Sequence, residues 1–238
     1  DPHMDKIVEE FELYGKTYRL ETGELAKQAT GAVLVTQGDT TVLVTAVVSK
    51  EERDYDFFPL TVDFMEKMYA VGRIPGGYLK REGKASEKGT LTARMIDRPI
   101  RPGFPDGFKN EVQIVATTFV VDGENAPDCI SVNGASAALL AGGAPFDGPV
   151  ACVRIGRNTE TGDFIVNPTY EELEGSDLNL TIAGTEHYIS MVEAGAEEIS
   201  EVDMLAAMNF GQEAIAQFCQ AQQRFLDKVN PQPLEYKL

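Results

Sequence analysis

Short runs in which apolar and polar residues alternate recur along this chain, and they limit it to a fold that is rich in β-sheet. Residues 33–35 and 42–44 are two such runs, and the Gly-Asp pair at 38–39 between them is typical of a hairpin turn. Residues 60–64 alternate in the same way, and residues 111–121 form a longer β-branched run. The sequence therefore predicts several strands that are joined by tight turns.

Three segments have the composition or the spacing of helices. Ser86 is a suitable N-cap for a helix over residues 90–96, which must end near Pro99. Residues 130–140, rich in Ala and Leu, predict a buried helix, and residues 200–229 repeat apolar side chains at helical spacing. Because hairpins and two helices precede a second set of strands and a last helix, we expect an α+β protein with two sub-lobes.

Composition disfavours several classes of protein. Hydrophobic residues make up 43% of the chain, which excludes intrinsic disorder, and no stretch approaches the roughly 18 apolar residues that a membrane helix needs. The three cysteines are widely spaced and there are only two histidines, so a zinc site is disfavoured and reduced, buried thiols are expected. The N-terminus has no signal-peptide pattern, which predicts a cytoplasmic protein without a membrane contact.

The charge of the chain is uneven. Its formal net charge is -17, with 21 basic and 38 acidic side chains, so the chain as a whole should repel RNA. Residues 67–101, however, hold nine basic and three acidic side chains, whereas residues 158–223 hold thirteen acidic side chains and no lysine or arginine. The basic segment predicts either a binding site for a polyanion or a contact between subunits.

Part of this basic segment is a glycine-rich loop over residues 72–83. The string Gly83-Lys84-Ala85 lacks the hydroxyl and the upstream glycine of a Walker motif, and no GxGxxG follows a strand. The loop tip combines one aromatic side chain with three cations, which suits the bases and phosphates of single-stranded nucleic acid. These residues are Tyr78, Lys80, Arg81 and Lys84. A solvated loop at a subunit contact is the alternative.

Three arginines follow the loop. Arg94, Arg98 and Arg101 recur at intervals of four and three, which places them on one helical face if the helix continues past Pro99. Such a group needs counter-charges, so we expect either bound phosphates or internal salt bridges with the many acidic residues.

Candidates for chemistry are fewer. Ser136 comes just after Gly134 and could donate a hydrogen bond to an anion near a helix start. Glu171 and Asp177 bracket a turn before a predicted strand, where two carboxylates could hold Mg²⁺. In so acidic a chain, a solvated surface is the alternative for this pair.

Four strings of residues resemble the bacterial polynucleotide phosphorylase family. They are Phe57-Phe58-Pro59-Leu60-Thr61-Val62, Gly72-Arg73-Ile74-Pro75-Gly76, Ile96-Asp97-Arg98-Pro99-Ile100-Arg101-Pro102 and Asn133-Gly134-Ala135-Ser136-Ala137. The similarity covers residues 11–210 and is to the first of the family's two RNase PH-like domains. It implies an RNase PH-like core of the ribosomal-protein βαβ type with two sub-lobes and a C-terminal helix.

The resemblance also implies a domain organisation. Residues 4–146 are expected to form the first sub-lobe and residues 147–215 the second, and residues 216–238 the end of the last helix and the start of a helical linker. Residues 1–3 are expected to be a cloning remnant. Because family members continue into further domains, the chain is expected to be a fragment.

The family degrades RNA by 3′→5′ phosphorolysis, in which inorganic phosphate attacks the terminal phosphodiester and a nucleoside diphosphate leaves; the reverse reaction adds nucleotides. The resemblance implies this nucleotidyltransferase activity, in mRNA degradation, for the full-length protein. It implies phosphate as a substrate and Mg²⁺ as a cofactor in the second core domain. It also implies a homotrimer that encloses a channel for single-stranded RNA, and partners from an RNA-degradation complex.

Individual roles follow from the same resemblance. The string Gly77-Tyr78-Leu79-Lys80-Arg81 matches the family's loop at the channel constriction, where Tyr78 keeps one aromatic ring and Leu79 lacks the second. The residues expected to line the RNA channel are Tyr78, Lys80, Arg81, Lys84, Arg94, Arg98 and Arg101.

The same comparison weakens the case for catalysis by this domain. Ala135 stands where the family's active domain has a phosphate-binding hydroxyl, which leaves Ser136, and Glu171 with Asp177 keeps the spacing of two active aspartates with one carboxylate changed. The domain is therefore expected to hold no catalytic residue and to contribute ring assembly and RNA contacts. A catalytically competent domain and a subunit-contact module without RNA contact are the alternatives.

Overall fold

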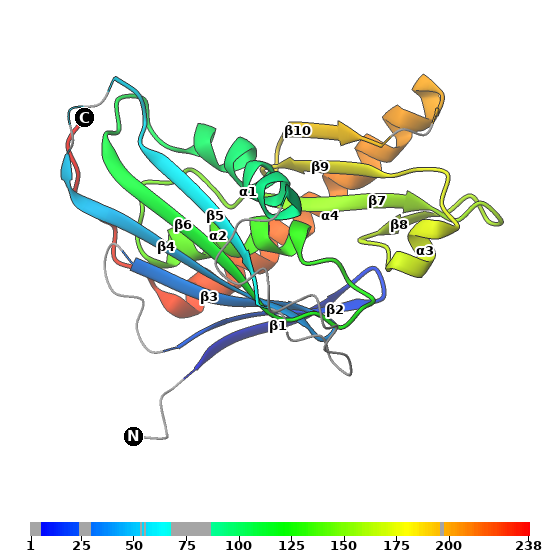
Figure 1. The fold of residues 1–238 in the computed structure, drawn as a ribbon, viewed down its shortest axis with the longest axis horizontal. Helices are drawn as coiled ribbons and strands as arrows, with labels where there is room; N and C mark the ends of the chain where they lie inside the picture. The colour runs from blue at the N-terminus through cyan, green and yellow to red at the C-terminus, as the bar shows by residue number, and fades with distance from the viewer. Residues whose placement is uncertain (1–5, 24–29, 53, 55, 68–86, 196–197) are drawn as a thin grey trace.

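The computed structural model describes residues 6–23, 30–52, 54, 56–67, 87–195 and 198–238 of the chain. They form two β-sheets with helices between and beside them (Figure 1). The predicted α+β class, the two sub-lobes and the long C-terminal helix are thereby confirmed. The expected cloning remnant at residues 1–3 lies outside the described residues.

The larger sheet has the strand order β1-β2-β3-β4-β6-β5. Its strands are β1 Ile7–Leu13, β2 Lys16–Thr22, β3 Thr30–Gln37, β4 Thr40–Glu52, β5 Leu60–Glu66 and β6 Asn110–Val120. Neighbouring strands are antiparallel except β5 and β6, which are parallel. Gln37 pairs with Thr40 across the predicted hairpin turn, where Gly38 has a φ of 59° that glycine adopts without strain.

The smaller sheet is antiparallel and has the order β10-β9-β7-β8. Its strands are β7 Ala151–Arg157, β8 Phe164–Val166, β9 Leu180–Gly184 and β10 Ile189–Ala194. All four come after residue 150, so the second set of strands that the sequence predicts forms a sheet of its own.

The helices are α1 Glu87–Ile100, the short 3₁₀ helix η2 Arg101–Gly103, α2 Asp128–Ala141, α3 Tyr170–Glu174 and α4 Glu201–Val229. Ser200 caps α4, because its hydroxyl accepts the Asp203 N–H at 3.1 Å. α4 continues through residue 216 to Val229, so residues 216–229 are the end of this helix. The division of the chain between residues 146 and 147 stays a prediction. In the described part of the chain, no helix is both long and apolar enough to cross a membrane.

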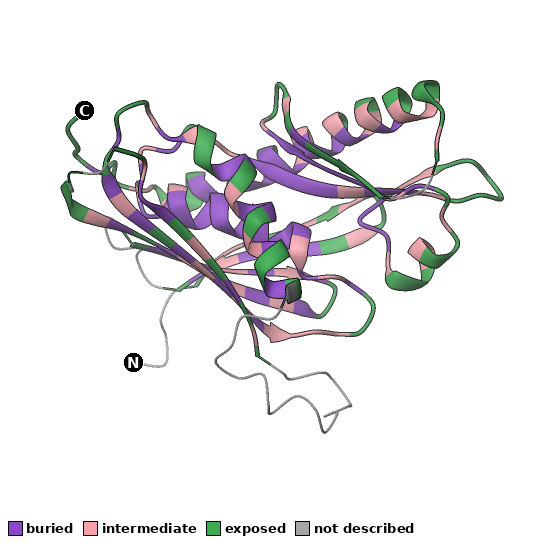
Figure 2. Ribbon diagram, turned by 45° about the horizontal axis from the view of Figure 1, so that its top comes forward, coloured by how far each residue is buried: buried purple, intermediate pink, exposed green. Residues whose placement is uncertain are grey.

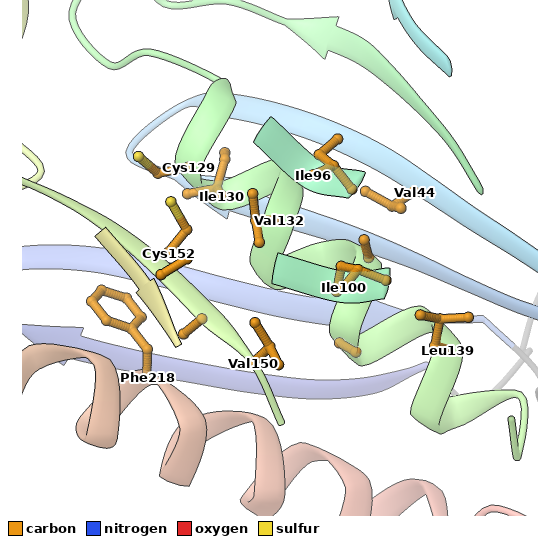
Figure 3. Packing of buried hydrophobic residues seen from close by; sticks show 14 of the residues in the cluster. Val44, Ile96, Ile100, Cys129, Ile130, Val132, Leu139, Val150, Cys152 and Phe218 are labelled. Atoms are coloured by element: carbon orange, nitrogen blue, oxygen red, sulfur yellow. The ribbon is translucent and has the colours of Figure 1, made fainter. Parts of the chain in front are cut away.

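The buried helix α2 is the centre of the core. It packs against β3 and β4 on one side and against β7 and α4 on the other. Gly31 of β3 makes this close approach possible, since a Cβ there would lie 1.8 Å from the carbonyl oxygen of Ala138. Figure 3 shows the apolar side chains that surround α2, with contributions from α1, α4, β4 and β7: Ile96, Ile100, Phe218, Val44 and Cys152.

Buried polar side chains connect the two lobes. Asn167, which follows β8, donates its amide to the hydroxyl of Tyr18 at 3.0 Å and accepts the N–H of Arg154 at 2.9 Å. Gln37 donates its amide to Asn125 and to the carbonyl oxygen of Asn167. Because an unpaired buried polar group costs free energy, these bonds fix one sheet relative to the other.

Candidate functional site

The basic segment is described at its two ends and along α1. Lys67 follows β5, and its ammonium lies 5.0 Å from the centre of the Phe119 ring. The loop residues between β5 and α1, at positions 68–86, are outside the described part of the chain. The RNA contacts expected there stay predictions for Tyr78, Lys80, Arg81 and Lys84.

α1 exposes one basic face and buries the other. Lys88, Leu91, Arg94 and Arg98 are exposed, and their spacing of three, three and four residues places them in one stripe along the helix, which we call the α1 stripe. α1 packs its buried face against β5 and α2 and also contacts β10. In Figure 2 the exposed residues of α1 lie on the side of the helix that faces solvent, and the helix itself lies between the two sheets.

Arg94 and Arg98 differ from the other described arginines. Five arginines form ion pairs with carboxylates: Arg19, Arg101, Arg154, Arg157 and Arg224. Arg94 and Arg98 have no ion pair with any residue that the structure describes, although the chain holds 38 acidic residues. Internal salt bridges, the alternative for this helix, account for Arg101; among the described residues they do not account for the two arginines of the α1 stripe.

Arg101 does not continue the α1 stripe. The helix ends at Ile100, and Arg101 is the first residue of η2. The guanidinium of Arg101 donates to both carboxylate oxygens of Asp97, at 2.8 and 2.9 Å, and to two main-chain carbonyl oxygens at the start of β5. Its charge is therefore balanced by Asp97 at the protein surface.

Ser136 lies inside α2 and has no exposed surface. Its hydroxyl donates to Oε1 of Gln222 at 2.7 Å and accepts the N–H of Val150 at 2.9 Å. The amide of Gln222 donates in turn to the carbonyl oxygen of Val150 at 2.8 Å. The structure thus gives Ser136 a different role from the phosphate contact expected from the sequence, because its hydroxyl is buried and joins α2 to α4 and to the start of β7.

The two acidic candidates do not form a metal site. Glu171 is exposed in the first turn of α3, whereas both carboxylate oxygens of Asp177 accept hydrogen bonds from Arg157, at 2.9 and 2.8 Å. These hydrogen bonds and the charge of Arg157 lower the pKa of Asp177. Within the described ranges, no three His, Cys, Asp or Glu side chains are grouped so that they could hold a metal ion. In the described part of the chain, Glu171 and Asp177 are therefore not placed to hold Mg²⁺ together.

One charged group that the sequence analysis missed lies at the N-terminus of α2, where a helix favours an anion. Asp128 accepts the N–H of Cys129 at 2.7 Å, and Arg154 donates to its two oxygens at 3.1 and 2.6 Å. Burial would raise the pKa of Asp128, but the charge and the hydrogen bonds of Arg154 outweigh burial and lower it. An acidic residue in a first helical turn was a visible signal, but its partner in β7 is 26 residues away.

These side chains divide into two groups. Ser136, Asp177 and Asp128 are bonded to other parts of the same chain, so they add rigidity to the junction of α2, β7 and α4. The α1 stripe is open to solvent and carries positive charge, so it can bind a polyanion. Among the described residues, the groups expected for phosphorolysis are not assembled around an accessible point.

Comparison with protein families matches nearly the whole chain. Residues 15–145 match the 3′ exoribonuclease family, domain 1, and residues 148–214 match domain 2 of the same family, both of the RNase PH type. The chain is also similar to a solved structure, rice (Oryza sativa) Rrp46, with a TM-score of 0.66 over 88% of this chain and 94% of that chain. At 15% sequence identity, this likeness concerns the fold alone.

Curated bacterial proteins are much more similar in sequence. The chain is 52% identical over 98% of its length to the polyribonucleotide nucleotidyltransferase of Listeria monocytogenes serovar 1/2a. It is 49% identical over 99% of its length to the protein of the same name from Bacillus subtilis strain 168. It covers 32% and 33% of these two proteins, so the chain spans about a third of the length of the curated relatives it matches.

Proposed function

Because the chain belongs to the 3′ exoribonuclease family, we propose that it is the N-terminal core domain of a longer 3′→5′ phosphorolytic exoribonuclease. In the reaction of the whole protein, inorganic phosphate attacks the 3′-terminal phosphodiester of RNA and a nucleoside diphosphate leaves; the reverse reaction extends the RNA. The name of the bacterial relatives, polyribonucleotide nucleotidyltransferase, and their identity to nearly the full chain support this proposal.

The task of this domain is to contact single-stranded RNA and to take part in ring assembly. The observation that carries the RNA role is the pair of exposed arginines, Arg94 and Arg98, that have no carboxylate partner among the described residues of a chain with a net charge of -17. Phosphate contacts by such side chains release counterions, and the acidic remainder of the chain restricts binding to this face. The loop residues Tyr78, Lys80, Arg81 and Lys84 extend the same surface in the proposal.

The phosphate- and Mg²⁺-dependent chemistry takes place in another part of the longer protein. The buried hydroxyl of Ser136 and the engagement of Asp177 by Arg157 support this assignment. A homotrimer with a central RNA channel, partners in an RNA-degradation complex and a cytoplasmic location complete the proposal, and they rest on the family resemblance.

Charge reversal on α1 tests the RNA contact. The Arg94→Glu/Arg98→Glu variant of the 238-residue chain is compared with the wild type by fluorescence anisotropy of a labelled oligo(A) at low salt. Loss of two phosphate contacts lowers the slope of log affinity against log salt by about 1.4 and the affinity by about tenfold or more. A Lys6→Glu/Lys50→Glu variant carries the same change in charge just before β1 and in β4, and it is expected to bind as the wild type does. Equal losses in both variants, or none in the first, contradict the proposal.

Two other outcomes would support the alternatives. Leu91 is 60% exposed in the middle of the α1 stripe, which favours a contact between subunits as the second candidate. In that case the charge reversal lowers the mass of the oligomer measured by light scattering and leaves RNA affinity unchanged. Phosphate-dependent release of nucleoside diphosphates from oligo(A) by this chain, abolished by Asp177→Asn, would instead show that the domain is catalytic.

A further inference from the structure

We propose that Arg101 is a positioning residue: it holds the last turn of α1 against β5, and through that turn it orients Arg98 and Arg94, without contacting RNA itself. This inference rests on the proposed RNA contact of the α1 stripe. It reverses the role that the sequence suggests for Arg101, which was expected to line the RNA channel with the other two arginines.

The guanidinium of Arg101 uses four of its five N–H donors within the chain. Nε and Nη2 donate to Oδ1 and Oδ2 of Asp97 at 2.8 and 2.9 Å, which is the paired geometry that Arg makes with a carboxylate. Nη1 donates to the carbonyl oxygen of Phe58 at 3.1 Å, and Nη2 donates also to that of Leu60 at 3.2 Å. One side chain thereby ties α1, η2 and the first residue of β5 together.

This connection lies where α1 is weakest. Pro99 is inside the last turn of α1 and has no N–H, so the helix loses one of its main-chain hydrogen bonds there. The Asp97–Arg101 pair has i,i+4 spacing and crosses the turn that contains Pro99. A side-chain connection therefore replaces the missing main-chain bond and keeps the residues on both sides of the proline in a fixed geometry.

The other end of the connection is rigid. Phe58 packs its ring 4.6 Å from that of Phe104, and Phe104 stacks on Phe108 at 5.6 Å. The guanidinium of Arg101 lies 5.8 Å from the centre of the Phe58 ring, which adds a cation–π contact to the hydrogen bonds. The last turn of α1 is therefore anchored to an aromatic cluster rather than to a loose segment.

The same contacts make Arg101 a poor ligand for RNA. To present the paired edge of its guanidinium to a phosphate, Arg101 would have to break its two charge-assisted bonds to Asp97, and the bonds to two main-chain carbonyl oxygens hold the group in place. Arg98 is exposed one turn earlier, and it has no ion pair with the described residues. Both arginines are exposed, but only Arg101 is bonded to β5 and to Asp97, so Arg101 fixes the helix and Arg98 keeps its charge available.

Substitution of Asp97 separates positioning from direct contact. If Arg101 bound RNA directly, Asp97→Ala would free its charge and raise RNA affinity or leave it unchanged. In the positioning role, Asp97→Ala lowers the affinity for oligo(A) about three- to tenfold although an acidic charge is lost, and Arg101→Ala does the same with an unchanged salt slope. The double variant is no weaker than Arg101→Ala alone, since both remove one pair.

Two comparisons complete the RNA test. Arg101→Lys does not restore the affinity, because a lysine cannot reproduce the paired bonds of the guanidinium. Arg94→Ala lowers the salt slope by about 0.7, as expected for one lost phosphate contact to a single strand. A similar drop in slope for Arg101→Ala, or an unchanged or higher affinity for Asp97→Ala, overturns the positioning role.

Hydrogen exchange gives a readout that needs no RNA. Arg101→Ala is expected to raise amide exchange in peptides that cover residues 57–66 and 91–101, whereas Arg94→Ala leaves it as in the wild type. Unchanged exchange in Arg101→Ala overturns the positioning role. A wild-type chain that does not bind oligo(A), or an Arg94→Ala variant that binds it as well as the wild type, overturns the proposed function instead. The two failures are therefore distinguishable.

Discussion

The buried connection of Ser136, Gln222 and Val150 offers a direct measure of what holds the two lobes together. Replacement of Gln222 by Leu leaves the carbonyl oxygen of Val150 without its donor and the hydroxyl of Ser136 without its acceptor. The three residues are exposed by 0%, 1% and 2%, so water cannot replace the lost partners. At about 1–3 kcal/mol for each buried group left unpaired, Gln222→Leu should lower the free energy of unfolding by about 2–6 kcal/mol.

Substitution of Ser136, the hydrogen-bond partner of Gln222, tests the same connection a second time. Ser136→Ala leaves the Val150 N–H without its acceptor and Oε1 of Gln222 without its donor, so by the same rule it should also destabilise the chain, by about 2–6 kcal/mol. The Ser136→Ala/Gln222→Leu variant should lose less than the sum of the two losses, because the bond between these side chains is counted in both single variants. Urea unfolding followed by circular dichroism measures all three, and each kcal/mol should lower Tm by about 2–4 °C.

Two results would refute this reasoning. A Gln222→Leu variant whose unfolding free energy stays within about 0.5 kcal/mol of the wild type would show that the connection does not hold the lobes together. Inorganic phosphate, compared with chloride at equal ionic strength, should raise Tm of the wild type no more than that of Ser136→Ala. A rise that requires Ser136 would return this hydroxyl to an anion site.

Two further predictions concern other parts of the core and its surface. Gly31→Ala places a Cβ 1.8 Å from the carbonyl oxygen of Ala138 and should lower the free energy of unfolding by about 3 kcal/mol or more. Gly15→Ala, at a φ of 77° in open space, should lower it by only about 1–2 kcal/mol. Similar losses of unfolding free energy for the two variants, measured with urea, would contradict the close approach of β3 to α2. Burial raises the pKa of Asp122, but hydrogen bonds, first from the Asn125 main chain, outweigh it and lower the pKa to about 2. The stability that Asp122 contributes is therefore complete above about pH 4 and is lost as the pH falls towards about 2. Asp122→Asn should lower the free energy of unfolding by about 1 kcal/mol at neutral pH and by less in acid. Equal losses at both pH values would refute this role of Asp122.

The strands could be predicted because burial in the larger sheet repeats with a period of two. Val42 and Val44 are fully buried against α2, whereas Leu43 between them lies on the other face and is only half-buried. The turn at Gly38 and the cap at Ser200 are local as well, since each depends on residues within a few positions. Wherever one element's own residues decide its conformation, the sequence was sufficient.

The candidate site could not be predicted to the same extent, because charge pairing depends on residues that only the fold brings together. Ser136 and Gln222 are 86 residues apart, and Arg157 and Asp177 are 20 residues apart in different elements. A spacing of six residues between Glu171 and Asp177 suggested two metal ligands, but the nearest partner of Asp177 is a cation. In a chain with 38 acidic residues, sequence spacing cannot tell which carboxylate neutralises which arginine.

Arg94 and Arg98 are important for the proposed RNA contact because the fold does not require these two side chains to be exposed. An exposed ion pair is worth about 0–1 kcal/mol, so the fold neither requires Arg94 and Arg98 to pair with a carboxylate nor gains from the absence of such a pair among the described residues. Asp97 lies on the same helix, but it binds Arg101 and so leaves the charge of the α1 stripe in place. A positive face within a negative molecule concentrates a polyanion at one location. The charge-reversal variant should therefore lose RNA affinity with little change in unfolding free energy, and a large loss of stability would assign these side chains to the fold rather than to binding.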